Sequence, residues 1–144
     1  MNYLRAIGFG IVLWVVVFVV LSILFFAPFL EEKTGWQYGI FWVLLIPITL
    51  FAAKWYFQDK INPTPARGLA LGIIGVIVAL ILDMIITVPL FVAIDIPYLQ
   101  VLSPFFGDWK LYIGLVEIVV LCLVAGSEFD QKNWQKLLRS SKKA

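Results

Sequence analysis

The chain has 144 residues, of which 62% are apolar and 14% are charged, and its net charge is +2. A soluble domain is about 45–50% apolar and about 25% charged, and one of this size buries only about 70% of the surface that its unfolded chain exposes. The excess of apolar surface predicts a membrane protein of one domain, and the small net charge argues against nucleic-acid binding.

The sequence contains no histidine and a single cysteine, Cys122. Zinc, haem and iron–sulfur sites therefore lose their usual ligands, and Ser–His and Cys–His nucleophile arrangements are excluded. No glycine-rich phosphate loop of the Walker or dinucleotide type is present. We therefore expect no metal, no cofactor and no enzymatic activity.

The first half of the chain predicts two membrane-spanning helices, over residues 6–30 and 35–57. Residues 6–30 form an uncharged stretch of 25 residues, whereas a spanning helix needs about 20. The stretch is also much longer than the apolar region of a signal peptide, which has about 7–15 residues, so we expect a retained helix. The second stretch has Trp36 and Tyr38 at one end and Trp55 and Tyr56 at the other, a pattern typical of aromatic belts at both membrane interfaces.

The second half predicts two more spans, over residues 68–94 and 109–127. Each carries one acidic residue inside its apolar run, Asp83 in the third span and Glu117 in the fourth. We expect residues 1–127 to form the transmembrane domain and residues 128–144 to form a basic cytoplasmic tail. The tail contains five basic residues: Lys132, Lys136, Arg139, Lys142 and Lys143. Basic residues near a membrane can bind anionic lipid headgroups at about 1 kcal/mol each, or they can act only as topology determinants.

The distribution of basic residues predicts the orientation of the four spans. Arg5 lies near the start of the chain, Lys60 and Arg67 lie between the second and third spans, and the tail holds five basic residues. Between the first and second spans, Lys33 is accompanied by two glutamates, and the connection between the third and fourth has no basic residue. The positive-inside rule then places both termini in the cytoplasm. The fold class that we expect is an all-α, integral membrane four-helix bundle with N-in/C-in topology.

A weak internal similarity suggests that the bundle consists of two tandem helical hairpins. Ser22 precedes Pro28 by six residues, as Asp83 precedes Pro89. Parallel repeats of this kind occur in some transporters.

Asp83 and Glu117 are the candidate functional residues. A carboxylate at the centre of a spanning helix costs at least about 2.5–3.5 kcal/mol, and such residues usually have a function. Counted from the outer ends of their helices at 1.5 Å per residue, Asp83 lies about 16 Å deep and Glu117 about 12 Å deep. We therefore expect them at similar depth. Two close carboxylates cannot both stay ionised in a low-dielectric site without a counter-charge, so such a pair would hold a proton or cation.

A stripe of small and polar residues defines the face of the third span on which Asp83 lies. Its members are Gly68, Gly72, Gly75, Ala79, Asp83 and Thr87, spaced by three or four residues. Small residues let helices approach closely in lipid, so this face is expected to contact other helices. Gly114 gives Glu117 a small neighbour on the fourth span, and Ser22 on the first span is expected at a depth similar to that of Asp83.

The segments Leu82–Phe91 and Asp108–Glu117 resemble small four-span bacterial membrane proteins that have no assigned activity. The resemblance covers mainly the second half of the chain. It implies a location in the bacterial inner membrane and carries no catalytic residues.

Two functions remain open from the sequence. The first is a transport-like role in which Asp83 and Glu117, with Ser22 and Thr87, bind a proton or cation, and in which a homo-oligomer is needed to enclose a pathway. The second is a non-catalytic role in membrane assembly, with another membrane protein as partner, in which the two acids only fix helix packing.

Overall fold

The computed structural model describes residues 2–28, 34–58, 62–91, 97, 100, 103, 106–128 and 131–143. Its main elements, in chain order, are α1 (Tyr3–Phe26), α2 (Thr34–Phe57), α3 (Pro65–Leu82), the π-helical turn η2 (Asp83–Thr87), α4 (Val88–Phe91), α6 (Trp109–Glu128) and α7 (Gln131–Ser141). The described part of the chain contains no β-strand. The all-α prediction is therefore confirmed for these residues.

Among the described residues, four helices are long and apolar enough to cross a membrane, in agreement with the four predicted stretches. They cover Tyr3–Phe26, Gly35–Phe57, Pro65–Leu90 and Trp109–Glu128, and the third includes the π turn and most of α4. Large apolar side chains are exposed along all four, for example Ile23, Val43, Ile77 and Val120. Apolar surface of this extent is expected to face lipid rather than water.

The helix ends differ from the predicted ones where proline and capping residues act. The first span was predicted to run from residue 6 to residue 30, but α1 begins at Tyr3 with Asn2 as its N-cap and ends at Phe26. Ala27 is extended because the ring of the following proline, Pro28, disfavours helical geometry at the residue before it.

The third span begins at Pro65, three residues earlier than predicted. The Thr64 side chain accepts a hydrogen bond from the Arg67 N–H and caps this helix end, and proline suits the first helical position because its missing N–H is not needed there. The predicted end of the span, residues 92–94, lies outside the described residues.

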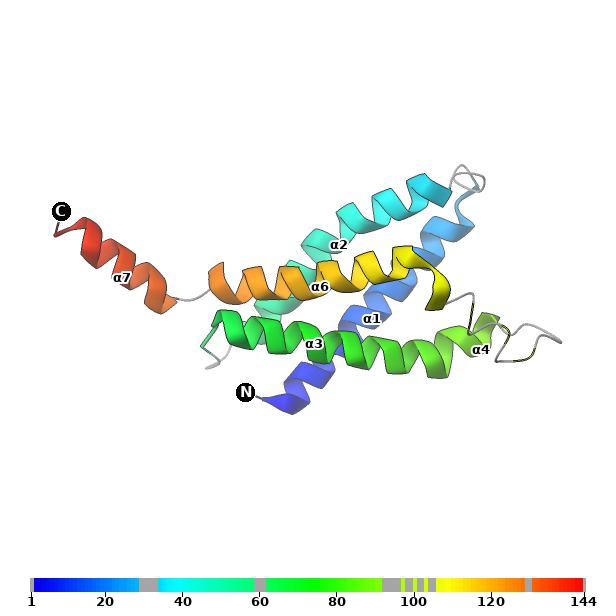
Figure 1. The fold of residues 1–144 in the computed structure, drawn as a ribbon, viewed down its shortest axis with the longest axis horizontal. Helices are drawn as coiled ribbons and strands as arrows, with labels where there is room; N and C mark the ends of the chain where they lie inside the picture. The colour runs from blue at the N-terminus through cyan, green and yellow to red at the C-terminus, as the bar shows by residue number, and fades with distance from the viewer. Residues whose placement is uncertain are drawn as a thin grey trace.

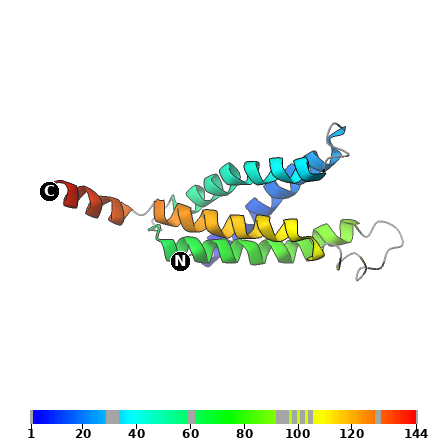
Figure 2. The same cartoon turned by 45° about the horizontal axis from the view of Figure 1, so that its top comes forward.

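The four spanning helices pack in four neighbouring pairs: α1 with α2, α1 with α3, α2 with α6, and α3 with α6. Contacting residues give the directions. Phe9 meets Tyr56 and Phe25 meets Tyr38, so α1 and α2 are antiparallel. Trp42 meets Trp109, and Leu45 lies next to Gly114, so α2 and α6 run in parallel. Figures 1 and 2 show α3 and α6 side by side along most of their length.

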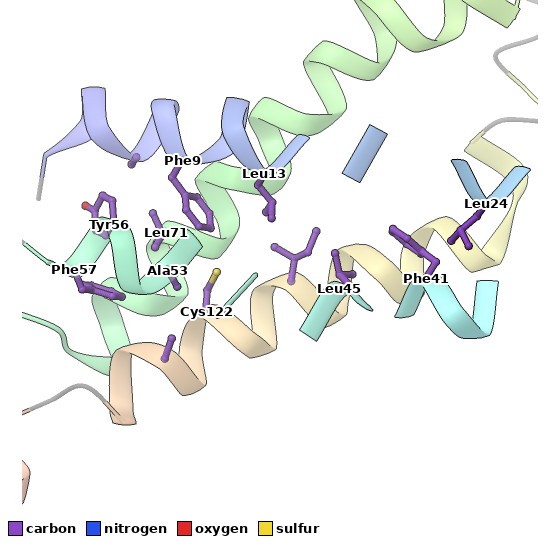
Figure 3. Packing of buried hydrophobic residues seen from close by; sticks show 13 residues of the cluster. Phe9, Leu13, Leu24, Phe41, Leu45, Ala53, Tyr56, Phe57, Leu71 and Cys122 are labelled. Carbon is purple, nitrogen blue, oxygen red and sulfur yellow. The ribbon is translucent and has the colours of Figure 1, made fainter. Parts of the chain in front are cut away.

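The side chains that the helices bury between them form a narrow apolar core. Phe9, Leu13, Leu45, Leu71 and Cys122 are almost completely buried and come from all four spanning helices. Figure 3 shows several of these side chains pointing into the space between the helices. Because lipid tails are as apolar as this core, close packing rather than removal from water must hold the helices together.

Candidate functional site

Asp83 accepts hydrogen bonds from side chains on two different helical segments. Its Oδ1 atom accepts a hydrogen bond from the indole Nε1 of Trp14, at 2.8 Å, and another from the hydroxyl of Thr87, at 2.7 Å. Trp14 belongs to α1, and Asp83 and Thr87 belong to η2, so the carboxyl joins the first and third spans. No other hydrogen bond to Asp83 comes from a side chain among the described residues.

The backbone at Asp83 departs from α-helical geometry. Residues 83–87 form a π-helical turn in which the N–H of Val88 donates to the carbonyl oxygen of Asp83, five residues earlier. Pro89 follows directly, and a proline inside a helix has no N–H to donate and crowds the carbonyl four residues before it, here that of Ile85. A widened turn accommodates both effects. Pro89 in the sequence and the π-helical backbone thus agree in placing an irregular turn at the half-buried Asp83.

The predicted stripe of small residues contacts two helices in succession. A Cβ atom added at Gly68 would collide with the carbonyl oxygen of Cys122, and one at Gly72 would lie 2.9 Å from Val119 Cα. A Cβ at Gly75 would instead lie 2.9 Å from the ring of Phe9 on α1. The first two glycines therefore face α6, whereas Gly75 and Asp83 face α1.

The remaining members of the stripe are also placed between helices. Ala79 and Thr87 are buried, at 9% and 7% exposure. Gly114, on α6, faces the other neighbour of that helix, since a Cβ added there would lie 3.5 Å from the ring of Phe41 on α2. These packing residues lie in helix–helix contacts, as the small-residue pattern indicates.

The glycine contacts also fix how α3 and α6 are aligned, and this alignment separates the two acids. Gly68 lies against Gly126 and Cys122, and Gly72 lies against Cys122 and Val119. Continuing the antiparallel alignment puts Glu117 level with Gly75. Asp83 then lies about eight residues farther along α3, or about 12 Å at 1.5 Å per residue.

The prediction that the two acids lie at similar depth is therefore wrong. That estimate assumed that the outer ends of the third and fourth spans lie level with each other. Figure 1 shows α4 continuing past the first turn of α6 instead. The close approach of the glycine backbones, and not helix length, sets the alignment.

Glu117 itself is partly exposed, and no described residue forms a hydrogen bond or ion pair with it. Lys110, seven residues earlier on α6, lies over the ring of Tyr38 with its Nζ 4.8 Å from the ring centroid. The Tyr38 hydroxyl in turn donates to Asp108 Oδ2 at 3.3 Å. Lys110, the basic residue nearest Glu117 in the fourth span, therefore interacts with Tyr38 at the end of the helix.

Ser22 is not brought to Asp83. Its hydroxyl donates to the carbonyl oxygen of Phe18 within α1, at 2.7 Å. Trp14 marks the level of Asp83 on α1, and Ser22 lies eight residues beyond it, about 12 Å along the helix axis. Of the four residues predicted to bind a proton or cation, the structure therefore joins Asp83 with Thr87 and leaves Glu117 and Ser22 apart from them.

The five basic tail residues lie within or just after α7. Lys136, Arg139, Lys142 and Lys143 have exposed side chains, and the side chain of Lys132 lies outside the described residues.

Sequence reasoning missed Trp14, which supplies the inter-helix donor to Asp83. We expected tryptophans such as Trp36 and Trp55 to lie at the membrane interfaces, whereas Trp14 is in the middle of α1. A buried indole N–H needs an acceptor, and its central position in an apolar helix was the available signal. Trp14 also stacks on Phe18, with ring centroids 5.2 Å apart, which fixes the indole plane.

The described residues contain no group of three His, Cys, Asp or Glu side chains that could hold a metal ion. No family model, no curated protein and no solved structure matches the chain.

Proposed function

We propose that the chain is a four-span protein of the bacterial inner membrane, with both termini cytoplasmic, whose Asp83 carboxyl binds a proton or a cation and thereby changes how α1 and α3 are held together. The observation that carries this proposal is the pair of hydrogen bonds that Trp14 and Thr87 donate to Asp83 Oδ1.

The energetics favour a bound proton or cation at Asp83. A charged carboxylate inside a span costs at least about 2.5–3.5 kcal/mol, whereas a hydrogen bond between membrane helices contributes about 0.6 kcal/mol on average and at most about 1.7. Only the bond from Trp14 joins two helices, and even if the bond from Thr87 contributes the same average amount, the two together offset about 1.2 kcal/mol, less than half of the cost. No basic side chain of the described residues is hydrogen-bonded to Asp83, so a proton or cation is the simplest compensation.

A change in the charge of Asp83 would act directly on the contact between α1 and α3. An ionised carboxylate accepts hydrogen bonds roughly twice as strong as those of a neutral group. Binding a proton would therefore weaken the bond from Trp14 and give the carboxyl a donor of its own. This is a local switch between two arrangements of the same helices.

The basic residues support the proposed topology. Arg5 and Arg67 lie at the ends of α1 and α3 that meet the ends of α2 and α6: the Arg5 guanidinium donates to the carbonyl oxygen of Trp55, and Gly68 meets Gly126. The positive-inside rule assigns this side to the cytoplasm.

Because Asp83 and Glu117 lie at different depths, the form of this function that we favour is transport of a proton or cation by the two acids in succession. Two carboxyls at different depths can serve as two stations, and a homo-oligomer would have to complete the pathway. The rival function is membrane assembly, with another membrane protein as partner. It is favoured by the tight contact of α3 with α6, which involves Gly68, Gly72 and Gly126 and does not need Asp83.

The test is reconstitution of the purified protein into liposomes that contain a pH-sensitive dye. We expect pH-dependent proton or cation flux in the wild type and its loss in Asp83→Asn, which keeps the acceptor oxygen but removes the charge. Glu117→Gln should abolish the flux only if both acids act as stations, so this variant tests whether Glu117 takes part in transport. If neither the wild type nor the variants conduct, transport is excluded and the assembly function is favoured.

Infrared spectroscopy tests the binding step without requiring flux. The wild type should show a protonated-carboxyl stretching band that titrates with pH and that disappears in Asp83→Asn. Glu117→Gln is the matched control, since it removes one acid from a neighbouring helix. A band that is unchanged in Asp83→Asn would contradict proton binding at Asp83.

A further inference from the structure

The helix α7 follows the fourth span almost without a break. The span ends at Glu128 and α7 begins at Gln131, so only two residues separate them. Figures 1 and 2 show α7 beyond the end of α6 and away from the other helices. A helix tethered this closely to a spanning helix stays within reach of the membrane surface, which gives any contact with that surface a high effective concentration.

One side of α7 is apolar and exposed. Leu137 and Leu138 have 63% and 55% of their surface exposed, and position 134, a tryptophan, precedes them by three and four residues. Residues three and four apart share a helix face. The described residues leave these two leucines uncovered, although the rest of the chain offers apolar helices to pack against.

The other side of α7 is basic. Lys132, Lys136 and Arg139 are spaced by four and three residues, which places them on one face. At 3.6 residues per turn this face lies nearly opposite the leucines. Residues 131–144 contain five basic residues and no acidic one.

We propose that α7 lies flat on the bilayer surface at the end of α6, with Leu137 and Leu138 inserted among the lipid headgroups and most of its basic side chains directed away from the bilayer. A short amphipathic helix with this distribution is typical of interfacial helices. The positive charge is attracted by anionic lipid, but it lies about one helix diameter, roughly 10 Å, from the headgroups, where salt screens much of the attraction. The apolar face, not the charge, therefore holds the helix in place.

This proposal depends on the membrane location of α6 and is independent of Asp83. A soluble acidic protein is the competing occupant for the basic face. The bilayer is favoured because it is continuous with α6 and because only it covers the exposed leucines.

The test compares Leu138→Cys with Ser140→Cys, two exposed positions on nearly opposite faces of α7. Both variants are made in the Cys122→Ala background. They are also made with the fully buried Cys122 retained, and the wild type then serves as the control for labelling of Cys122. Each is labelled with an environment-sensitive fluorophore and placed in lipid nanodiscs made with phosphatidylcholine alone or with added phosphatidylglycerol. Quenching by aqueous iodide and by lipids with doxyl-labelled acyl chains is then measured.

We expect iodide to quench the label at position 138 about threefold less than the label at position 140, and doxyl lipid to show the opposite order, in both lipid mixtures and at high salt. Equal quenching at the two positions in both mixtures would overturn the proposal. Protection of position 140 that appears only when polyglutamate is added, with position 138 open to iodide, would assign α7 to a soluble acidic partner and would also overturn it.

Discussion

The third span holds its neighbours in two different ways along its length. In its first half, the backbone of α3 approaches α6 so closely that Gly68, Gly72 and Gly126 leave no room for a Cβ atom. In its second half, a π turn presents Asp83, which accepts a hydrogen bond from Trp14 on α1. The first contact depends on shape and the second on one polar group.

This difference shows what each kind of helix–helix contact can do. Shape complementarity is fixed once the helix is formed and does not respond to conditions. A hydrogen bond to a carboxyl contributes less, about 0.6–1.7 kcal/mol, but its strength changes with the charge of the acceptor. The second half of the span is therefore the part that can change state, and the following substitutions test that contrast.

The largest effect is expected for Gly68→Ala. The new Cβ atom would collide with the carbonyl oxygen of Cys122, so α3 and α6 must move apart, at a cost of about 1–3 kcal/mol. The free energy of unfolding in mixed micelles with increasing dodecyl sulfate measures this cost.

Gly39→Ala on α2 is the matched control for that substitution. A Cβ atom there would meet nothing within 4 Å, so the change should be neutral or stabilise the helix by up to about 1 kcal/mol. Equal destabilisation by the two substitutions would show that the α3–α6 contact is not tight.

A smaller loss is expected for Trp14→Phe, which keeps an aromatic ring but removes the donor to Asp83. The free energy of unfolding should fall by about 0.6–1.7 kcal/mol, in addition to any loss from the smaller ring. A double-mutant cycle with Asp83→Leu isolates the hydrogen bond, because the loss from the ring should persist when Asp83 is absent. Additive effects of the two substitutions would contradict an energetic contribution from this bond.

The smallest effect on stability is expected for Pro89→Ala. Because the π turn already accommodates the proline, restoring an N–H should change the free energy of unfolding by less than about 1 kcal/mol, well below the roughly 3 kcal/mol of a proline in a regular helix. The sharper readout is the NMR chemical shift of the Trp14 indole N–H. That signal should move if the turn becomes α-helical, whereas an unchanged signal would mean that Pro89 does not shape the Asp83 site.

The sequence predicted the elements better than their mutual positions. Long apolar stretches identify the four spans because the bilayer demands them, and the three-and-four spacing of Gly68, Gly72 and Gly75 correctly marks a contact face. Spacing alone gives neither the neighbour that each glycine meets nor the alignment of two antiparallel helices. For that reason, the prediction that Asp83 and Glu117 lie at similar depth was wrong.

The sequence pattern also did not predict where the backbone departs from regular helical geometry. Pro89 signals an irregularity, but the period of the helix does not say that it takes the form of a π turn at Asp83. The tail was predicted as a basic segment of residues 128–144, and that prediction did not include the helix that residues 131–141 form within it.

The contact between Trp14 and Asp83 also makes the site optically readable. An indole changes the energy of its excited state when a nearby charge appears or disappears, and here the charge would lie one hydrogen bond from Nε1. The five other tryptophans are at positions 36, 42, 55, 109 and 134, all nearer to the ends of their helices than Trp14 is. A fluorescence difference between the wild type and Trp14→Phe would therefore isolate one chromophore in the middle of α1, and the protein would report the charge of Asp83 without an added probe.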